Sequence, residues 1–167
     1  MSKGSIKRFF GHNIVIIYTL VAIVYGVITI YATDLTPVEA FLQSFLFWCV
    51  GWWLAVAFFL HWIQPSADKI AEGIGWPKGS PFQKEVAAAD GAFGILGIIC
   101  GFISPSDFWT ATAIGASFML FMMGVGHVID VVKNKNRSPL NAGSTMYFGL
   151  LLPVVLITLL ILWKAGV

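Results

Sequence analysis

Five long apolar runs alternate with short polar segments along the chain. The runs cover residues 14–32, 38–63, 86–103, 108–132 and 145–163. Each has about 18 residues or more, close to the roughly 20 that an α-helix needs to cross about 30 Å of hydrocarbon. Because lipid cannot satisfy free backbone N–H and C=O groups, such runs must be helical. The pattern predicts an all-α fold, a transmembrane bundle of five helices that forms a single integral membrane domain over residues 1–167.

Basic side chains gather in three of the polar segments, which lie on the same side of the predicted bundle. They are Lys3, Lys7, Arg8, Lys69, Lys78, Lys84, Lys133, Lys135 and Arg137. The stretches around Asp34 and Asp107 contain acids and no base. Lys- and Arg-rich loops stay in the cytoplasm during insertion. We therefore expect a cytoplasmic N-terminus, a cytoplasmic loop at residues 64–84 and an extracytoplasmic C-terminus.

The connecting segments repeat a short motif of a hydroxyl residue, proline and a polar residue two positions later. It begins at Thr36, Ser80, Ser104 and Ser138. A hydroxyl at the N-cap and proline at the first helical position are typical of helix starts. The motif therefore predicts where four of the helices begin. Within the 64–84 loop, residues 66–74 could form a short interfacial helix with Ile70 and Ile74 facing lipid.

Small residues mark one face of the third predicted span. They are Gly91, Gly94, Gly97 and Gly101. Small side chains let neighbouring helices approach closely in a membrane. We therefore expect the third span to be the central one, with the glycines of the fourth span, Gly115, Gly124 and Gly126, as its matching surface.

Composition narrows the class of protein further. Hydrophobic residues make up 58% of the chain and charged residues 11%, whereas soluble domains contain about 25% charged residues. A net charge of +2 gives no indication of nucleic-acid binding. Cys49 and Cys100 each lie inside an apolar run without a CxxC motif, which is typical of buried thiols. We expect a multi-pass protein of the cell membrane whose first partner is the lipid bilayer.

A few ionisable residues fall inside the predicted spans, where each costs about 2.5–3.5 kcal/mol. They are His61, Glu85, Asp90, His127 and Asp130. Asp90 is six residues past Lys84, and His127 is six residues before Lys133, so both should lie roughly 9 Å below the inner boundary. We therefore expect Asp90 and His127 to approach each other. Asn141 could complete this polar pocket beneath the 64–84 loop.

Several interpretations of this polar pocket stay open. It could be a structural network that locks two helices together, or a proton or ion path, since a histidine–carboxylate chain can titrate near neutral pH. It could also hold a metal or haem, with ligands drawn from His61, Glu85, Asp90 and His127, although none is required. A membrane enzyme acting on lipid headgroups is the last option. No nucleophile elbow, P-loop or Ser–His–Asp order favours it.

The functional prediction is a small membrane protein whose inner-leaflet pocket handles protons, a cation or a small polar ligand, by transport or by binding. The alternative from a different class is a non-catalytic accessory or structural subunit of a larger membrane complex. Homo-oligomers are compatible with both. An enzymatic role is the less favoured expectation.

Several short motifs resemble a known pattern. They are Phe47-Trp48-Cys49-Val50-Gly51, Gln64-Pro65, Glu85-Val86-Ala87-Ala88-Ala89-Asp90 and Gly124-Val125-Gly126-His127. With them, residues 45–162 resemble an uncharacterised family, a domain of unknown function, of small prokaryotic polytopic membrane proteins. Ala87 replaces a glycine of that pattern, and Asp90 stands where it has asparagine. The resemblance implies a polytopic membrane fold and marks Glu85 and His127, but it implies no activity.

Overall fold

The computed structural model describes the backbone of residues 3–167 and the side chains of residues 13–167. Every regular element in this part of the chain is a helix. The elements are α1 (Lys3–Ala32), α2 (Pro37–Ser44), the π-helix η1 (Phe45–Trp52), α3 (Trp53–Trp62), α4 (Gln64–Ile74), α5 (Phe82–Cys100), α6 (Asp107–Lys133) and α7 (Ser144–Lys164). The all-α prediction is confirmed over the described residues.

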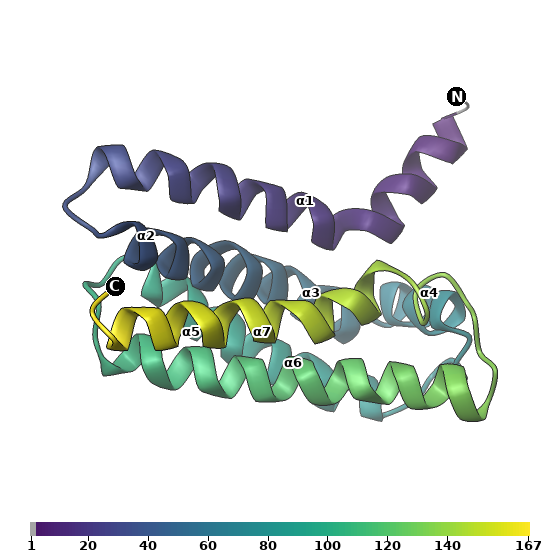
Figure 1. Cartoon of the computed structure of the whole chain (residues 1–167). Coiled ribbons are helices and arrows are strands. Elements are labelled where there is room, and N and C mark those ends of the chain that lie inside the picture. The colour runs from purple at the N-terminus through teal and green to yellow at the C-terminus, as the bar shows by residue number, and fades with distance from the viewer. Residues whose placement is uncertain (1–2) are drawn as a thin grey trace.

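The long helices run side by side as an antiparallel bundle (Figure 1). The elements α2, η1 and α3 follow one another without a break and form one long helix, and the short helix α4 lies at one end of the bundle. The first part of α1 bends away from the bundle at Asn13, whose φ of −122° and ψ of 16° are not helical. The loops rich in Lys and Arg between α4 and α5 and between α6 and α7 lie at the α4 end.

Within the described residues, four helical segments are long and apolar enough to cross a membrane. They are Asn13–Ala32, Pro37–Trp62, Asp107–Lys133 and Ser144–Lys164. The 19-residue helix α5 is not among them, and it carries Lys84, Glu85 and Asp90. The four segments suggest a membrane protein. A fifth span through α5 and the orientation of the two termini stay predictions.

The central helix is the second one of the bundle rather than the third. The helix formed by α2, η1 and α3 packs against α1, α4, α5, α6 and α7, whereas α5 packs mainly against α3 and η1. The expectation that the third span is central is therefore wrong. A stripe of glycines permits one very close approach, but it does not determine how many neighbours a helix has.

The glycines of α5 face the preceding helix. A Cβ atom on Gly94 would lie 2.7 Å from the backbone nitrogen of Ala55, and one on Gly97 would lie 2.6 Å from the carbonyl oxygen of Leu46. The matching surface is therefore α3 and η1, not the glycines of α6. Gly124 of α6 packs against Gly149 of α7 instead.

The predicted capping motif forms completely at one of the four positions, although α5 and α6 begin one and two residues past the predicted prolines Pro81 and Pro105. Thr36 caps α2: its hydroxyl accepts from the backbone N–H of Glu39, and the Glu39 carboxylate accepts from the backbone N–H of Thr36. The helices after Ser80 and Ser104 begin two to three residues later, at Phe82 and Asp107, without a side-chain cap. The Ser138 motif forms a turn, and α7 begins only at Ser144.

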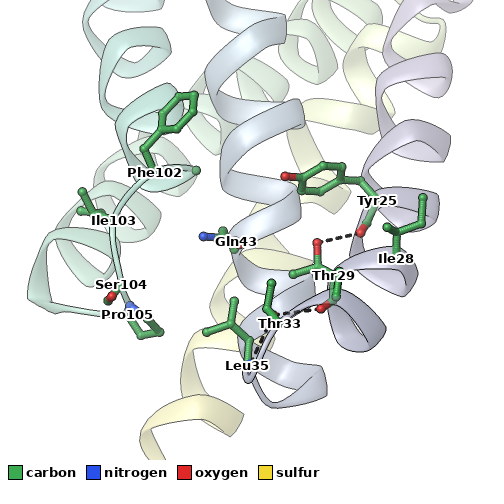
Figure 2. A pocket seen from close by; sticks show the side chains of 12 residues that line it. Tyr25, Ile28, Thr29, Thr33, Leu35, Gln43, Phe102, Ile103, Ser104 and Pro105 are labelled. Atoms are coloured by element: carbon green, nitrogen blue, oxygen red, sulfur yellow. Dashed lines mark hydrogen bonds between the residues drawn. The ribbon is translucent and has the colours of Figure 1, made fainter.

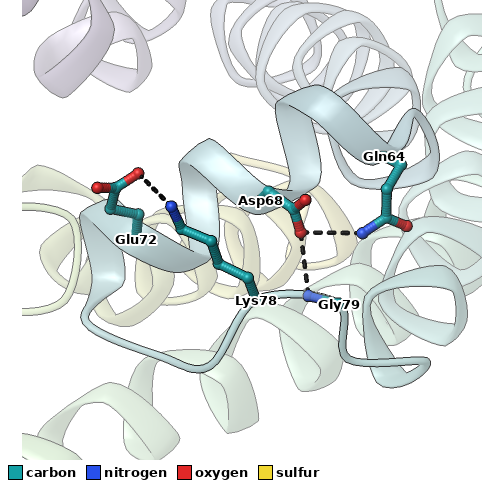
Figure 3. Close-up of polar contacts among 5 residues, drawn as sticks. All are labelled: Gln64, Asp68, Glu72, Lys78 and Gly79. Atoms are coloured by element: carbon teal, nitrogen blue, oxygen red, sulfur yellow. Dashed lines mark hydrogen bonds and ion pairs between the residues drawn. The ribbon is translucent and has the colours of Figure 1, made fainter.

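The 64–84 loop contains the predicted short helix, α4. Its apolar residues Ala67, Ala71 and Ile74 are buried against the rest of the protein, so the prediction that Ile74 faces lipid is wrong. Figure 3 shows the exposed polar side: the Asp68 carboxylate accepts from the Gln64 amide at 2.9 Å and from the backbone N–H of Gly79 at 3.0 Å. These bonds fold the segment after α4 back along the helix.

Candidate functional site

A polar cluster at the α4 end of the bundle joins three parts of the chain. We call it the inner-loop network; it consists of Trp76, His127, Asp130, Asn136 and Asn141. Asn141 is completely buried. Its amide oxygen lies 2.7 Å from Nδ1 of His127, and its amide nitrogen donates to the carbonyl oxygen of Asn136 at 2.8 Å. This one side chain therefore connects α6 to the segment that precedes α7.

The carboxylate of Asp130 is the acceptor at the centre of the network. It receives hydrogen bonds from the indole N–H of Trp76 at 3.0 Å and from the amides of Asn134 and Asn136, each at 2.7 Å. The ring of Trp76 stacks on His127 with 5.9 Å between the ring centres and 13° between their planes. The i, i+3 spacing of His127 and Asp130 places both on one face of α6, where Trp76 contacts both.

Backbone groups extend the network to α4. The Asn136 amide also donates to the carbonyl oxygen of Ile74 at 2.8 Å, and the backbone N–H of Leu140 donates to the carbonyl oxygen of Gly73 at 3.2 Å. The end of α4 is thus held against the α6–α7 connection. Gly75, with a φ of +85°, permits the left-handed turn that brings Trp76 into the network.

Asp90 lies outside the inner-loop network. Only 3% of the residue is exposed, yet it makes no hydrogen bond or ion pair within residues 13–167. It shares the buried face of α5 with Ala87, Gly94 and Gly97. Since Gly94 faces Ala55, this face of α5 is directed toward α3.

The expected pairing of Asp90 with His127 is therefore wrong. The physical reason is rotation about the helix axes. Equal depth below the inner boundary brings two residues to one level, but the buried face of Asp90 is turned toward α3 while His127 is bonded to Asn141. Depth can be counted along the sequence, whereas the direction of a side chain depends on which neighbour each helix packs against.

The remaining predicted pocket residues are also apart from the network. His61, near the end of α3, pairs through Nδ1 with the amide oxygen of Gln83 on α5. Glu85 is exposed at the start of α5. The described part of the chain contains no group of three or more His, Cys, Asp or Glu side chains placed to share a metal ion. The structure thus brings together His127, Asp130 and Asn141, but not His61, Glu85 or Asp90.

A cavity of about 390 Å³ lies at the opposite end of the bundle, a feature that the sequence interpretation missed (Figure 2). One wall is a face of α1 that carries Tyr25 and Thr29 and is continued by Thr33 just past the helix, and the other is the segment 101–105 after α5. A signal for this wall is present in the sequence, because hydroxyl-bearing residues at i, i+4 and i+8 share one face of a helix. Gln43 of α2 projects between the two walls.

The described part of the chain is an all-helical bundle in which four segments are long and apolar enough to cross a membrane. The chain belongs to a family of unknown function, DUF6790, whose model matches residues 12–166. The resemblance to an uncharacterised family is thereby confirmed. No curated protein and no solved structure matches the chain.

Proposed function

We propose that this is an integral membrane protein in which the buried carboxyl group of Asp90 binds and releases a proton. The single observation that supports it is the environment of Asp90, which is 3% exposed and has no hydrogen-bonding or ionic partner within residues 13–167. Ionisable side chains inside membrane helices are rare and mark proton and ion pathways. In this proposal Asp90 carries the proton, and its protonation is coupled to transport or to the binding of a solute.

The proposal includes five spans, with α5 as the third and the N-terminus in the cytoplasm. The distribution of basic residues supports it, since all those between α3 and α7 lie at the α4 end of the bundle, in α4, in the two loops there or in the helix turns next to these loops. They are Lys69, Lys78, Lys84, Lys133, Lys135 and Arg137. Such loops remain cytoplasmic. Asp90 lies two turns inside α5 from this end, so a proton would reach it from the cytoplasmic side.

A proton fits Asp90 better than a metal cation does. A charged carboxylate buried without a counter-charge is costly, and the cost disappears when the group is neutral. Calcium needs about six or more oxygen ligands, and magnesium needs six in a nearly octahedral arrangement. The bonds of the described residues bring no second polar side chain to Asp90. A proton needs only the carboxyl group itself.

The inner-loop network has a structural role in this proposal. Asp130 already accepts hydrogen bonds from three side chains, and Asn141 uses both ends of its amide. Groups that are mutually satisfied hold a fixed geometry. The network would thus keep α4 and the α6–α7 connection in place while Asp90 changes its protonation state.

The test is infrared spectroscopy on the purified protein in lipid, combined with proton uptake into liposomes measured with a trapped pH-sensitive dye. Asp90→Asn is compared with Asp34→Asn, which changes an exposed acid in the α1–α2 loop. We expect the wild type and Asp34→Asn to show the carbonyl band of a protonated carboxylic acid that disappears as the pH is raised. Asp90→Asn should lack this band and should lose proton uptake.

A wild-type spectrum without that band, or a band that persists in Asp90→Asn, would overturn the proposal. Melting temperature in detergent is measured in parallel, since a neutral asparagine at this position should leave stability unchanged. An accessory subunit of a larger complex stays the alternative prediction, and co-purification with a partner at fixed stoichiometry would support it.

A further inference from the structure

The cavity at the end of the bundle away from α4 has the features of a second, unrelated binding site. Its volume of about 390 Å³ falls within the roughly 300–1,000 Å³ of small-molecule sites. No acidic or basic side chain lines it. Its polar groups are hydroxyls, an amide and backbone, supplied by residues such as Tyr25, Thr29, Gln43 and Ser104.

Two helices end at this cavity, and both ends have the same polarity. The C-terminus of α1 at Ala32 and the residues that follow α5 at Cys100 both contribute to the lining. The last carbonyl groups of a helix lack intrahelical donors and carry partial negative charge. A ligand group that donates hydrogen bonds is favoured next to these carbonyl groups. The N-termini of α2 and α6 begin two residues past the lining at Leu35 and Pro105, so helix ends of both signs are near the cavity, which matches an uncharged ligand.

The side chains in the cavity leave acceptors free as well. The Thr29 and Thr33 hydroxyls donate to carbonyl oxygens of their own helix, each at 2.9 Å (Figure 2). Gln43 donates from its amide nitrogen to the carbonyl oxygen of Cys100 at 3.4 Å, and its amide oxygen has no further partner within residues 13–167. That oxygen is therefore available to a donor on the ligand.

A shallow apolar groove on the surface of α1 alone adjoins the cavity. It is lined by Leu20, Val21, Val24, Tyr25 and Ile28, of which Tyr25 and Ile28 also line the cavity. Leu20, Val24 and Ile28 are all more than half exposed on the outer face of α1. In a membrane this face would meet lipid chains, so the groove leads from the hydrocarbon to the polar cavity.

We propose that the cavity and groove together bind a membrane lipid with an uncharged, hydroxyl-bearing head and an apolar chain. The head would donate hydrogen bonds to Gln43 and to the terminal carbonyl groups of α1 and α5. The chain would lie against Leu20, Val24 and Ile28. The site is separate from Asp90 and does not depend on the proton-binding role.

The test uses the full chain in phosphatidylcholine nanodiscs and three probes that share one photoreactive acyl chain. They are a 1-monoacylglycerol, the corresponding fatty acid at a pH where it is ionised, and a lysophosphatidylcholine. After illumination, mass spectrometry maps the labelled peptides. We expect the acyl chain of the monoacylglycerol to label residues 20–28 of α1, and unlabelled monoacylglycerol to compete for this labelling.

Two variants and a matched control make the result specific. Ala32→Phe fills the cavity and should abolish the competed labelling, while Ala111→Phe changes an exposed alanine of α6 outside the lining and should leave it unchanged. Gln43→Leu removes the acceptor and should weaken competition about two- to tenfold, as expected for one hydrogen bond. Melting temperatures of all variants show that each is folded.

Three outcomes would overturn the inference. Labelling spread over the exposed faces of α6 and α7 as strongly as over α1 would show ordinary contact with bulk lipid. Equal labelling of residues 20–28 by the ionised fatty acid or by the lysophosphatidylcholine would exclude a preference for an uncharged head that donates hydrogen bonds. Unchanged labelling in both Gln43→Leu and Ala32→Phe would show that the head lies elsewhere.

Discussion

Two aspartates in the same half of the bundle have opposite environments. Asp130 lies at the end of α6 and accepts hydrogen bonds from Trp76, Asn134 and Asn136. Asp90 is buried on the α5 face that is directed toward α3 and accepts none within residues 13–167. The carboxylate of Asp130 thus has hydrogen-bond donors that stabilise its charge, whereas the carboxyl group of Asp90 has none within residues 13–167. The first stabilises two loops, and the second is the candidate for chemistry.

The surroundings of the two groups differ as well. The inner-loop network is built from amides, an indole and an imidazole on segments that a short polar connection brings together. The contact of α5 with α3 and η1 is built from glycines and an alanine that bring backbones into contact. Next to Asp90, Gly91 faces the ring of Phe58, so the part of this interface nearest to the carboxyl group is apolar and offers no hydrogen-bonding side chain.

The largest effect on stability is expected when α5 is forced away from η1 and α3. Gly97→Val would place a branched side chain against the backbone of Leu46 and Gly51. Overpacking of this kind costs about 3 kcal/mol, and a rigid backbone cannot yield. We expect a strongly lowered melting temperature and loss of the Asp90 infrared band. Gly126→Val, at a glycine with open space around its Cβ position, should leave both unchanged.

A smaller loss of stability is expected when hydrogen bonds of the inner-loop network are removed. Asn141→Leu leaves the His127 ring nitrogen and the Asn136 carbonyl oxygen without their present partner. Each buried unpaired group costs about 1–3 kcal/mol, so the loss of stability should be about 2–4 kcal/mol. Arg137→Leu, on an exposed residue that is not part of the network, should cost about 0.5 kcal/mol or less. Thermal unfolding in detergent measures both.

The same variant distinguishes the two aspartates. If Asn141→Leu lowers stability but the Asp90 carbonyl band and its pH dependence are kept, the network is structural and independent of proton binding. A shifted or missing band in a variant that remains folded would mean that the inner-loop network affects the protonation of Asp90, so the two aspartates would not be independent.

The smallest effect is expected at the exposed surface of the α4 end. Lys78 and Glu72 form an ion pair at 2.9 Å (Figure 3), and Glu72 raises the pKa of Lys78 above its ordinary value. A raised lysine pKa adds stability that is fully present below the ordinary value of 10.5 and is lost only as the pH rises through the folded value. The difference in melting temperature between Lys78→Met and the wild type should therefore be small and nearly constant from about pH 6 to pH 9. A marked pH dependence in this range would contradict it.

The helices themselves could be predicted, because long apolar runs have one stable backbone conformation in lipid. The ends of most apolar runs could be predicted as well: the runs 38–63, 108–132 and 145–163 agree within one residue with Pro37–Trp62, Asp107–Lys133 and Ser144–Lys164. The capping motif was correct in full only at Thr36. At Ser138 the same motif gives a turn, since Asn141 bonds to His127 and Asn136 instead of entering α7. Local propensity at that point is overridden by a contact with α6, which no local pattern contains.

The sequence by itself determined the helical segments and the division of charge between the two ends, whereas the depth at which Asp90 and His127 lie stays a prediction. Tertiary structure alone decided which way each helix is turned. The reason is physical: a helix that is apolar on nearly all sides has no strong polar face to indicate its rotation. Packing then fixes it, and here the glycines of α5 met the backbone of α3 and η1, turning Asp90 toward α3 and leaving His127 to Asn141.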